Sequence, residues 1–598
     1  MSKSRVAERR AAYALKTAVE PAFGTSFDLL ATAPQGVAKL RELILSSAVR
    51  GRLLAQEPTD EPACALLTSI ASLREKALSG RRARGAAERS HADNFNSADL
   101  LPAGWITAAG GELYSVVRGV SYQKQDAIES PRASYIPLLR ANNIQQRMNF
   151  NSLVYVPEHL VSIDQRLVEG DFVVCLASGS KSLVGKAARF SGTECYTFGA
   201  FCGSLRAFDT TIVPYLSVFF ASPLYRDAVS LASSGIGINN LKSTTLVALD
   251  VPLPPLAEQA RIVARVEELM QLCDTLEAHG RLQDEQHARL VATLFDVLAA
   301  STSAEELAEN WQRIATHFDL LLDRPEAVDA LEQAILQLAV RGLLVPQDES
   351  DEPASKLLDR IRAEKGQLVA EGKVGRDMPL PQVADDEAPF VVPAAWQWVR
   401  FGALVRKSEA GWSPSCEGGS RRGDAWGVLK VSAVSWGEFR SSENKQLPAS
   451  LKPRPEYEVQ SGDFLISRAN TEELVARSVV AKNPEPRLML SDKIIRLDIS
   501  SLVDRDFLNM VNNAKTSRTY YAENASGTSS SMKNVGRQVI LNLPIPLPAL
   551  AEQHRIVARV EQLRRLCADL RERLQQARVT QSRLADALVS AADQSSAC

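Results

Sequence analysis

The stretch "PLAEQARIVARVEEL" at 255–269 returns almost unchanged as "ALAEQHRIVARVEQL" at 549–563. In the first copy the apolar positions Ile262, Val266, Leu269, Cys273 and Leu276 are spaced alternately by four and three residues, and the second copy repeats this spacing. Apolar residues in this spacing, flanked by Arg and Glu, are typical of a coiled-coil seam. The two stretches therefore predict two long helices that pack on other helices.

The repeat extends over almost the whole chain of 598 residues. Trp105 matches Trp396 at an offset of 291 residues, and Glu258 matches Glu552 at an offset of 294. A repeat of about 290 residues is far longer than the 20 to 50 residues of a solenoid repeat. We therefore interpret the chain as two whole modules, and we expect 256–361 to be helical throughout.

Two stretches with a different texture lie between the helical segments. They hold most of the aromatic residues, the glycines and the β-branched runs, such as "DFVVCLASGS" and "DFLISRANT". Short runs of this kind between turn signals predict strands. The proline-rich "VPLPPL" and "IPLPAL" suit edge strands that lead into a first helical turn, and they mark domain boundaries. The two inserts have diverged far more than the helices, which suggests two related binding tasks on different targets.

Composition excludes several classes of protein. The apolar runs are far too short to cross a bilayer, and the charged N-terminus has no apolar segment after it, so we expect neither a membrane span nor a secretory leader. The eight cysteines form no C-x-x-C pair, and the six histidines show no metal-binding spacing. These features predict a cytoplasmic protein without a metal site.

Charge is compatible with nucleic acid but does not require it. The net charge is −2, while 391–548 holds 21 Lys and Arg against 16 Asp and Glu, and 101–250 holds 12 against 11. A locally basic face is enough to bind phosphates, so a weak bias of this kind permits DNA binding.

The second module contains "SGDFLISRANTEELVARSVV" and "PIPLPALAEQHRIVARVEQL", and the first contains "YIPLLRANNI" and "SGIGINNLKSTTLVALDVPLPPLAEQARIVARVE". In these motifs the chain resembles the specificity subunit of type I restriction–modification enzymes. The resemblance covers nearly the whole chain. The first insert departs from the pattern, because "LASGSKS" stands where the second has "SRANT".

This resemblance implies an α+β fold with two globular mixed α/β target-recognition domains, separated by long antiparallel coiled-coil helical regions in a pseudo-two-fold duplication. Each domain would read one half of a bipartite double-stranded DNA site. The helices would set the spacing and bind two modification (adenine methyltransferase) subunits, through which restriction/translocase subunits join. S-adenosylmethionine, ATP and Mg²⁺ would belong to those partner subunits, with no cofactor in this chain.

The same resemblance divides the chain into five segments. They are an N-terminal helical region (1–100), a first recognition domain (101–253), a central helical region (254–390), a second recognition domain (391–547) and a C-terminal helix (548–598). The C-terminal helix matches 256–299, and the continuation that it lacks is found at the N-terminus instead. We therefore expect the two ends of the chain to pair, as in a closed ring of two repeats cut once.

Catalysis is not expected of this chain. An adenine methyltransferase of this class carries an (N/D)-P-P-(Y/F) element, and the sequence has none, nor a Walker-type loop. We interpret the chain as a non-catalytic recognition subunit. Two alternatives stay open: a single-chain DNA-modifying enzyme with an unrecognised catalytic centre, and a coiled-coil scaffold whose inserts bind protein.

Polar side chains near the strand ends of the inserts are the candidate DNA contacts, because Arg pairs with guanine and Asn with adenine in the major groove. In the second insert they are Lys430, Ser432, Trp436, Arg468, Asn470, Thr471 and Lys533, and in the first they are Arg140, Asn142, Asn143, Ser178, Gly179, Lys181 and Lys242. Lys533 and Lys242 lie beside Gly- and Ser-rich runs and are candidates for phosphate contact. The competing interpretation is that the Asn residues cap local turns and that the Gly- and Ser-rich runs are flexible loops.

Overall fold

The computed structural model describes residues 27–79, 101–145, 147–192, 194–232, 239–375, 380–416, 418–435, 437–527 and 532–594. The chain forms two compact units. Unit 1 comprises Met1–Gln283 and Arg578–Cys598, and unit 2 comprises Asp284–Ala577. Each unit therefore joins one insert to the helices beside it.

Two helices of 45 residues each, α9 (Leu256–Ala300) and α18 (Leu550–Gln594), begin in one unit and end in the other. Most of the predicted seam is buried, namely Ile262, Val266, Leu269 and Cys273 in α9 and Ile556, Val560 and Cys567 in α18. The other seam positions, Leu276, Leu563 and Leu570, are half-buried. The prediction of long, packed helices is therefore confirmed. Within the described ranges, no helix is both long and apolar enough to cross a membrane.

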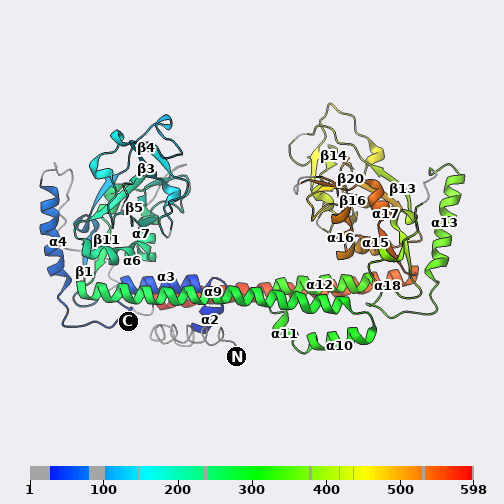
Figure 1. The fold of residues 1–598 in the computed structure, drawn as a ribbon, viewed down its shortest axis with the longest axis horizontal. Coiled ribbons are helices and arrows are strands. Elements are labelled where there is room, and N and C mark those ends of the chain that lie inside the picture. Colours follow the sequence, from blue (N-terminus) through cyan, green and yellow to red (C-terminus); the bar gives the residue numbers. More distant parts are fainter. Residues whose placement is uncertain are drawn as a thin grey trace. The chain divides into compact units, whose positions relative to one another are not determined.

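A third helix completes the packing in each unit. In unit 1, α3 (Gly36–Val49) packs on the seam of α9 and on Ala585 of α18. In unit 2, α12 (Pro325–Val340) packs on the seam of α18 and on Phe295 of α9 (Figure 1). In unit 1 the first part of α9 thus shares a core with the last part of α18. In unit 2 the last part of α9 shares a core with the first part of α18, as expected for an antiparallel pair.

The central region is not helical throughout, which corrects the expectation for 256–361. After α9 come α10 (Ala304–Ala315), α11 (Phe318–Leu321), α12 and α13 (Ala354–Ala370), with no helix between 341 and 353. Gly342 ends α12 with a φ of +76°, and the Leu343 N–H donates to the Leu338 carbonyl at 3.0 Å. This pattern is the Schellman ending of a helix, which Gly adopts without strain. The same turn occurs at Gly51 in unit 1, between α3 and α4 (Ala63–Leu78).

The two inserts contain sheets with the same strand order, although their sequences differ. In unit 1 a four-stranded antiparallel sheet runs β2 (Tyr114–Arg118), β9 (Cys202–Ala207), β5 (Phe172–Cys175), β7 (Ala187–Arg189), and a three-stranded sheet runs β4 (Val154–Pro157), β3 (Tyr135–Leu139), β8 (Thr197–Phe198). In unit 2 the corresponding sheets run β13 (Val405–Ala410), β20 (Ile494–Ile499), β16 (Phe464–Ser467), β18 (Ser478–Val480) and β15 (Asn444–Gln446), β14 (Gly427–Leu429), β19 (Leu488–Met489). The mixed α/β inserts and the duplication are therefore confirmed.

Short helices cover these sheets and connect them to the long helices. In unit 1 these helices are α5 (Gly110–Leu113), α6 (Val213–Ala221), α7 (Pro223–Ala232) and α8 (Ser243–Val247), and in unit 2 they are α14 (Phe401–Leu404), α15 (Arg505–Asn513), α16 (Lys515–Asn524) and α17 (Arg537–Asn542). Helix α2 (Phe27–Thr32) of unit 1 packs on α3 instead. Buried Phe172 and Phe219 of the insert belong to the same core as Leu40 of α3. The insert and the helices of a unit are thus held together by one continuous apolar core.

The proline-rich segments form the predicted edge strands. Antiparallel pairs β1 (Ile106–Ala109) with β11 (Asp250–Leu253), and β12 (Gln397–Arg400) with β22 (Pro544–Leu547), are each a separate two-stranded sheet. Each strand of a two-stranded sheet pairs along one edge only. A proline, which has no N–H to donate, is therefore tolerated where its nitrogen faces the unpaired edge. β11 and β22 each lead directly into a long helix.

Candidate nucleic-acid interface

In the second insert, the segment that holds the candidate contact Asn470 lies against the segment that holds the candidate contact Lys533. Strand β17 (Ala469–Asn470) pairs with β21 (Lys533–Asn534), and Asn470 and Lys533 are register partners. In unit 1, β6 (Ala177–Ser178) pairs with β10 (Asn239–Asn240), and Ser178 is the partner of Asn239. The "LASGSKS" stretch thus occupies in unit 1 the position that "SRANT" occupies in unit 2.

The side chain of Asn470 connects β17 to the preceding loop. Its Nδ2 donates to Ser435 Oγ at 2.9 Å, and its Oδ1 accepts the Thr471 N–H at 2.8 Å. Ser435 follows a 3-10 turn at Val431–Val434 that ends the β14 segment. Trp436 lies outside the described residues. Asn470, Thr471 and the start of this loop are therefore brought together.

Two other candidates of unit 2 share a carboxylate. Ser432 Oγ donates to Glu443 Oε2 at 2.7 Å, and Lys430 Nζ lies 3.6 Å from the same oxygen. The Ser432 hydrogen bond and the Lys430 charge lower the pKa of Glu443. Lys430 and Ser432 therefore belong to one small polar cluster.

Arg468 and Lys533 differ in the partners that lie near their charged groups. Arg468 is half-buried, and its charge helps to lower the pKa of Asp492, although no carboxylate of the described residues lies within ion-pair distance of its guanidinium. Lys533 Nζ donates to the Gly527 carbonyl at 3.2 Å and lies 3.9 Å from Glu472 Oε2. Of these two, Arg468 has the side chain with more capacity left for a ligand.

The Asn143 side chain of unit 1 behaves as a local cap. It is 1% exposed, its Oδ1 accepts the Arg140 N–H at 2.9 Å, and its Nδ2 donates to the carbonyls of Asn149 and Asn151 at 2.8 and 2.9 Å. An amide that is buried and satisfied at both ends has nothing left to offer a base edge. These contacts favour the capping interpretation for Asn143, and its role as a DNA contact stays a prediction. Its neighbour Asn142 is exposed.

The remaining candidates of unit 1 are exposed or nearly so. Arg140 Nη2 donates to the Ser152 carbonyl at 3.0 Å, and Ser178 Oγ accepts the Ser180 N–H at 3.2 Å. Gly179 and Lys181 are exposed in the turn after β6. Lys242 is exposed immediately before α8, whereas the preceding 233–238 lies outside the described residues. Lys242 follows β10 rather than belonging to it, so it is not the positional counterpart of Lys533.

A buried polar junction was missed in the sequence, although its residues stand inside the opening repeat. In unit 1 the Glu258 carboxylate is 1% exposed and accepts hydrogen bonds from Trp105 Nε1 and Gln56 Nε2, both at 2.9 Å. Burial raises the pKa of Glu258, and these two hydrogen bonds counteract the rise. The junction ties the start of α9 to the loop after α3 and to the start of the insert.

Unit 2 repeats this junction residue by residue. Glu552 accepts hydrogen bonds from Trp396 Nε1 at 2.9 Å and Gln347 Nε2 at 2.5 Å, and burial raises its pKa. Outside it, Arg555 makes two bonds to the Asp351 carboxylate at 2.6 and 3.1 Å. The signal that could have found the junction is the retention of Trp and Gln at an offset of 291 residues and of Glu and Arg at an offset of 294.

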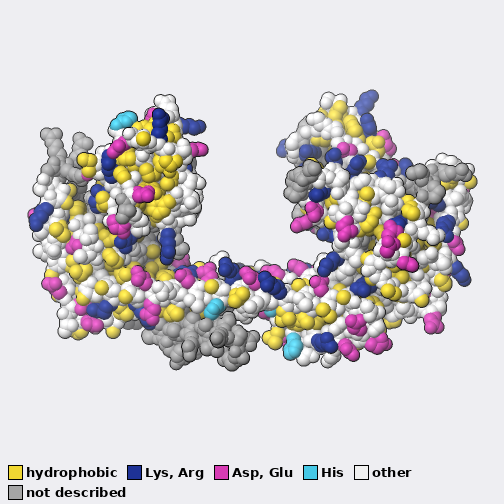
Figure 2. Space-filling model, in the orientation of Figure 1, with side chains coloured by type: hydrophobic (Ala, Val, Ile, Leu, Met, Phe, Trp, Pro, Cys, Tyr) yellow, Lys and Arg dark blue, Asp and Glu magenta, His cyan; other side chains and the backbone are white. Residues whose placement is uncertain are grey.

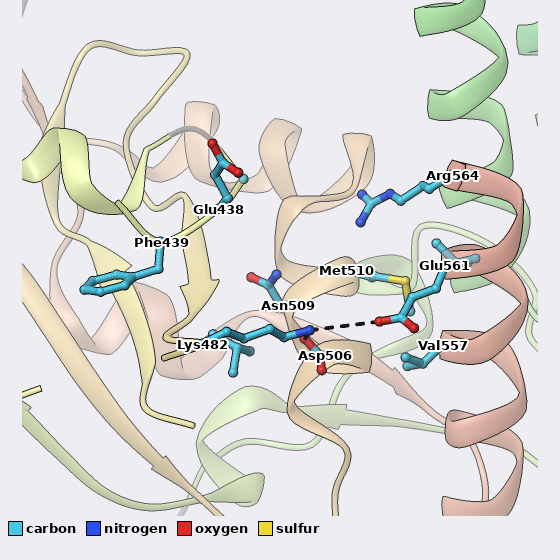
Figure 3. A pocket seen from close by; sticks show the side chains of 12 residues that line it. Glu438, Phe439, Lys482, Asp506, Asn509, Met510, Val557, Glu561 and Arg564 are labelled. Atoms are coloured by element: carbon cyan, nitrogen blue, oxygen red, sulfur yellow. Dashed lines mark ion pairs between the residues drawn. The ribbon is translucent and has the colours of Figure 1, made fainter. Parts of the chain in front are cut away.

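A cavity of about 370 Å³ lies within unit 2 between the insert and α18. Its lining is both apolar, with Phe439 and Met510, and charged (Figure 3). Lys482 Nζ lies 3.2 Å from Asp506 and 3.9 Å from Glu561, so the charges of these three side chains compensate one another.

The face of the molecule that Figure 2 shows has no surface of a single charge, because basic and acidic side chains are intermixed on it.

Comparison with known proteins gives matches over most of the chain. The family model described as "Type I restriction modification DNA specificity domain" matches residues 102–284 and 440–578. The chain is 35% identical to the type I restriction enzyme EcoEI specificity subunit of Escherichia coli over 93% of this chain and 94% of that protein. It is 31% identical to the EcoAI specificity subunit of Escherichia coli over the same shares. A solved chain of a type I R-M system aligns with a TM-score of 0.41 and 16% identity, over 83% of this chain and 99% of that chain.

Proposed function

The chain belongs to the family of type I restriction–modification specificity subunits, and we propose that the strand pairs β6–β10 and β17–β21 each help to read one half of a bipartite DNA site. The chain recognises DNA and is not itself the enzyme. One observation supports the assignment of the reading surface. The two units share a scaffold but place different side chains at matched positions of these strand pairs, with Ser178 and Asn239 in unit 1 against Asn470 and Lys533 in unit 2.

The proposal assigns different roles to different candidates. Asn470, Arg468 and Thr471 would contact base edges in one half-site, because Asn, Arg and hydroxyl groups carry the donors and acceptors that the major groove requires. In the other half-site the contacts would come from the Ser178 hydroxyl, the Lys181 ammonium group and the backbone of Gly179. Lys533, Lys242, Arg140 and Lys430 would contact phosphates, which position the protein without reading sequence. Asn142 and Ser432 would support these contacts.

The helical regions would bind the rest of the complex. We propose that α9 and α18 hold two modification subunits, and that restriction/translocase subunits join through them in the cytoplasm. S-adenosylmethionine, ATP and Mg²⁺ would be bound by those partners. The recognition domains would correspond to 101–253 and 391–547, between helical segments 1–100, 254–390 and 548–598.

The test is to co-express the chain with its modification subunit and to map adenine methylation on a genome. Asn470→Ala should relax or alter one half-site and leave the other unchanged, with a loss of affinity of about 1–3 kcal/mol. Ser178→Ala is the matched variant and should alter the other half-site. If both variants change the same half-site, or if neither changes any, these strand pairs do not read the sequence.

A second arm tests whether the helices set the spacing of the half-sites. Insertion of four residues near Leu276 should advance α9 by about 6 Å and lengthen the spacer by about two base pairs, with both half-sites unchanged. An insertion variant that methylates with its original spacer would show that α9 does not measure the distance.

A further inference from the structure

Ion pairs connect the short helix to the long helix in each unit. In unit 1, Arg41 of α3 contacts two carboxylates of α9, Asp274 at 2.5 Å and Glu277 at 2.9 Å. The Arg41 side chain is 20% exposed, while those of Asp274 and Glu277 are 72% and 65% exposed. In unit 1 the short helix is therefore the basic partner and the long helix the acidic one.

In unit 2 the signs are reversed. Glu332 of α12 lies 3.3 Å from Arg564 and 3.1 Å from Arg571 of α18, and Asp329 of α12 lies 2.6 Å from Arg571. Glu332 matches Arg41 at the repeat offset of 291, and Arg571 matches Glu277 at the offset of 294. The Arg41–Glu277 ion pair of unit 1 and the Glu332–Arg571 ion pair of unit 2 therefore occupy matched positions, but the basic and acidic partners are exchanged.

The apolar residues that the helices of a pair share are largely alike in the two units, unlike the charges beside them. The seams of α9 and α18 repeat the same Ile, Val, Leu and Cys in the same spacing. Leu40 and Ile44 of α3 are matched by Leu331 and Ile335 of α12, and all four are buried. At these positions the apolar surfaces of the two short helices are alike, although buried Leu43 of α3 is matched by the smaller Ala334 of α12.

Crossed pairs would bring like charges together. With α3 on α18, Arg41 would face Arg564 and Arg571, and with α12 on α9, Glu332 would face Asp274 and Glu277. Charges flanking an apolar seam select among helices in this way, by favouring the correct pair and penalising the wrong one.

The order of synthesis makes the second crossed pair a real competitor. Helix α12 begins at residue 325, only 25 residues after α9 ends, whereas its native partner α18 begins at residue 550. Since domains fold as the chain emerges, α12 is exposed to the seam of α9 before α18 exists. It could also meet the seam of α9 in a second copy of the chain.

We propose that the inverted ion pairs form a pairing code, which assigns α3 to α9 and α12 to α18 and rejects exchange of helices between the two repeats, within one chain or between two copies. Each pair at such a surface contributes little by itself. The selection acts because the crossed state loses the five attractive contacts of the native pairs and places Arg41 beside Arg571, and Glu332 beside Asp274 and Glu277. The inference is independent of whether the inserts read DNA.

The experiment gives both units the same polarity while keeping the native pairs satisfied. The variant Arg41→Glu, Asp274→Ala, Glu277→Lys copies into unit 1 the signs of unit 2, since Ala568 is the match of Asp274. The full chain is unfolded, refolded by dilution and treated with a carbodiimide, which joins a lysine to a neighbouring carboxylate. Mass spectrometry then distinguishes a native link from position 277 to position 41 from a crossed link to Asp329 or Glu332.

The triple variant should form crossed links, and its dimers and larger species on size exclusion should increase about tenfold over a control that keeps the native polarity. The control is Arg41→Lys, whose lysine should link only to Asp274 and Glu277. Where the triple variant does not refold, the reciprocal variant Glu332→Arg, Arg564→Met, Arg571→Glu gives unit 2 the signs of unit 1 and should also form more dimers and larger species than the control. A refolded triple variant without crossed links, or a refolded variant of either kind with no more oligomers than the control, would overturn the proposal.

Discussion

The indole of Trp396 donates a 2.9 Å hydrogen bond to the buried carboxylate of Glu552, which lies 156 positions further along the chain. The corresponding bond in unit 1, from Trp105 to Glu258, has the same length. These bonds fasten the start of each insert to the helix that follows the insert, so their loss should loosen one unit at a time.

Trp396→Phe should destabilise unit 2 by about 1–3 kcal/mol, because it leaves the Glu552 carboxylate with one donor fewer in a buried site. Hydrogen–deuterium exchange of the first turns of α18 should rise, while the first turns of α9 stay protected. Trp311→Phe is the control, since that indole is 42% exposed. Equal protection of α18 in both variants would remove the junction as a stabilising element.

The stability of the junction should depend on pH. Burial raises the pKa of Glu552 above its ordinary value of 4.5. The folded state therefore holds this proton more tightly than the unfolded state, and the contribution of Glu552 is largest below pH 4.5 and is lost as the pH rises through the folded pKa. The Glu552→Gln variant cannot lose it. In urea unfolding, the stability of wild type relative to this variant should decrease as the pH rises from about 4.5, and an increase would reverse the assigned sign.

Gly342→Ala should cost unit 2 about 1–3 kcal/mol or more. The φ of this residue is +76°, and an added Cβ would lie 2.7 Å from Pro393 Cγ and 2.9 Å from Trp396 Cζ2. The control is Gly280→Ala within α9, where a Cβ meets nothing within 4 Å. That change should instead stabilise the helix by about 0.5–1 kcal/mol. Thermal unfolding of the two variants should therefore shift in opposite directions.

Lys533→Ala should weaken DNA binding about equally for all sequences and lower the slope of log K against log salt by about one unit. The control is Lys373→Ala, because that side chain is paired with Glu371 in the turn after α13 and is not a candidate contact. A salt slope identical to wild type would place Lys533 away from the phosphates.

A circular permutant should fold and bind DNA. Lys39 of α3 pairs with Asp586 of α18 at 2.6 Å, so segments close to the two ends of the chain are packed in one unit. New ends can be opened at the exposed turn of Gly372. Circular dichroism and DNA binding should match wild type once the old ends are joined by a flexible linker. An unfolded permutant would show that the native chain order is required for assembly.

The long helices and the duplication could be predicted from sequence because their signals are local and repeated. A seam such as Ile262 to Leu276 shows its spacing within four turns, and the edge strands show their prolines. The helix break at 341–353 was also visible, in Gly342 and Pro346, but Ala- and Leu-rich neighbours on both sides obscured it.

The pairing of short strands could not be predicted. Strands β17 and β21 are two residues long and are separated by 62 residues of the chain, so only the folded insert selects their register. The environment of Asn143 could not be predicted either. Its "ANN" context suits both a base contact and a turn cap, and only the folded structure shows the buried amide that favours the cap.

The repeated junction has a consequence for the history of the protein. All the residues that fasten an insert at its junction, namely Trp105, Glu258 and Gln56 in unit 1 and Trp396, Glu552 and Gln347 in unit 2, lie at or outside the ends of the insert. The interior of an insert can therefore mutate, or be replaced by recombination within these flanks, without loss of the junction, as long as positions such as Phe172 and Phe219 that share the core with the short helix stay apolar. A lineage could acquire a new specificity in one unit while the other unit and the helices stay intact, and the strong divergence of the two inserts on an almost unchanged frame is the record that such a process would leave.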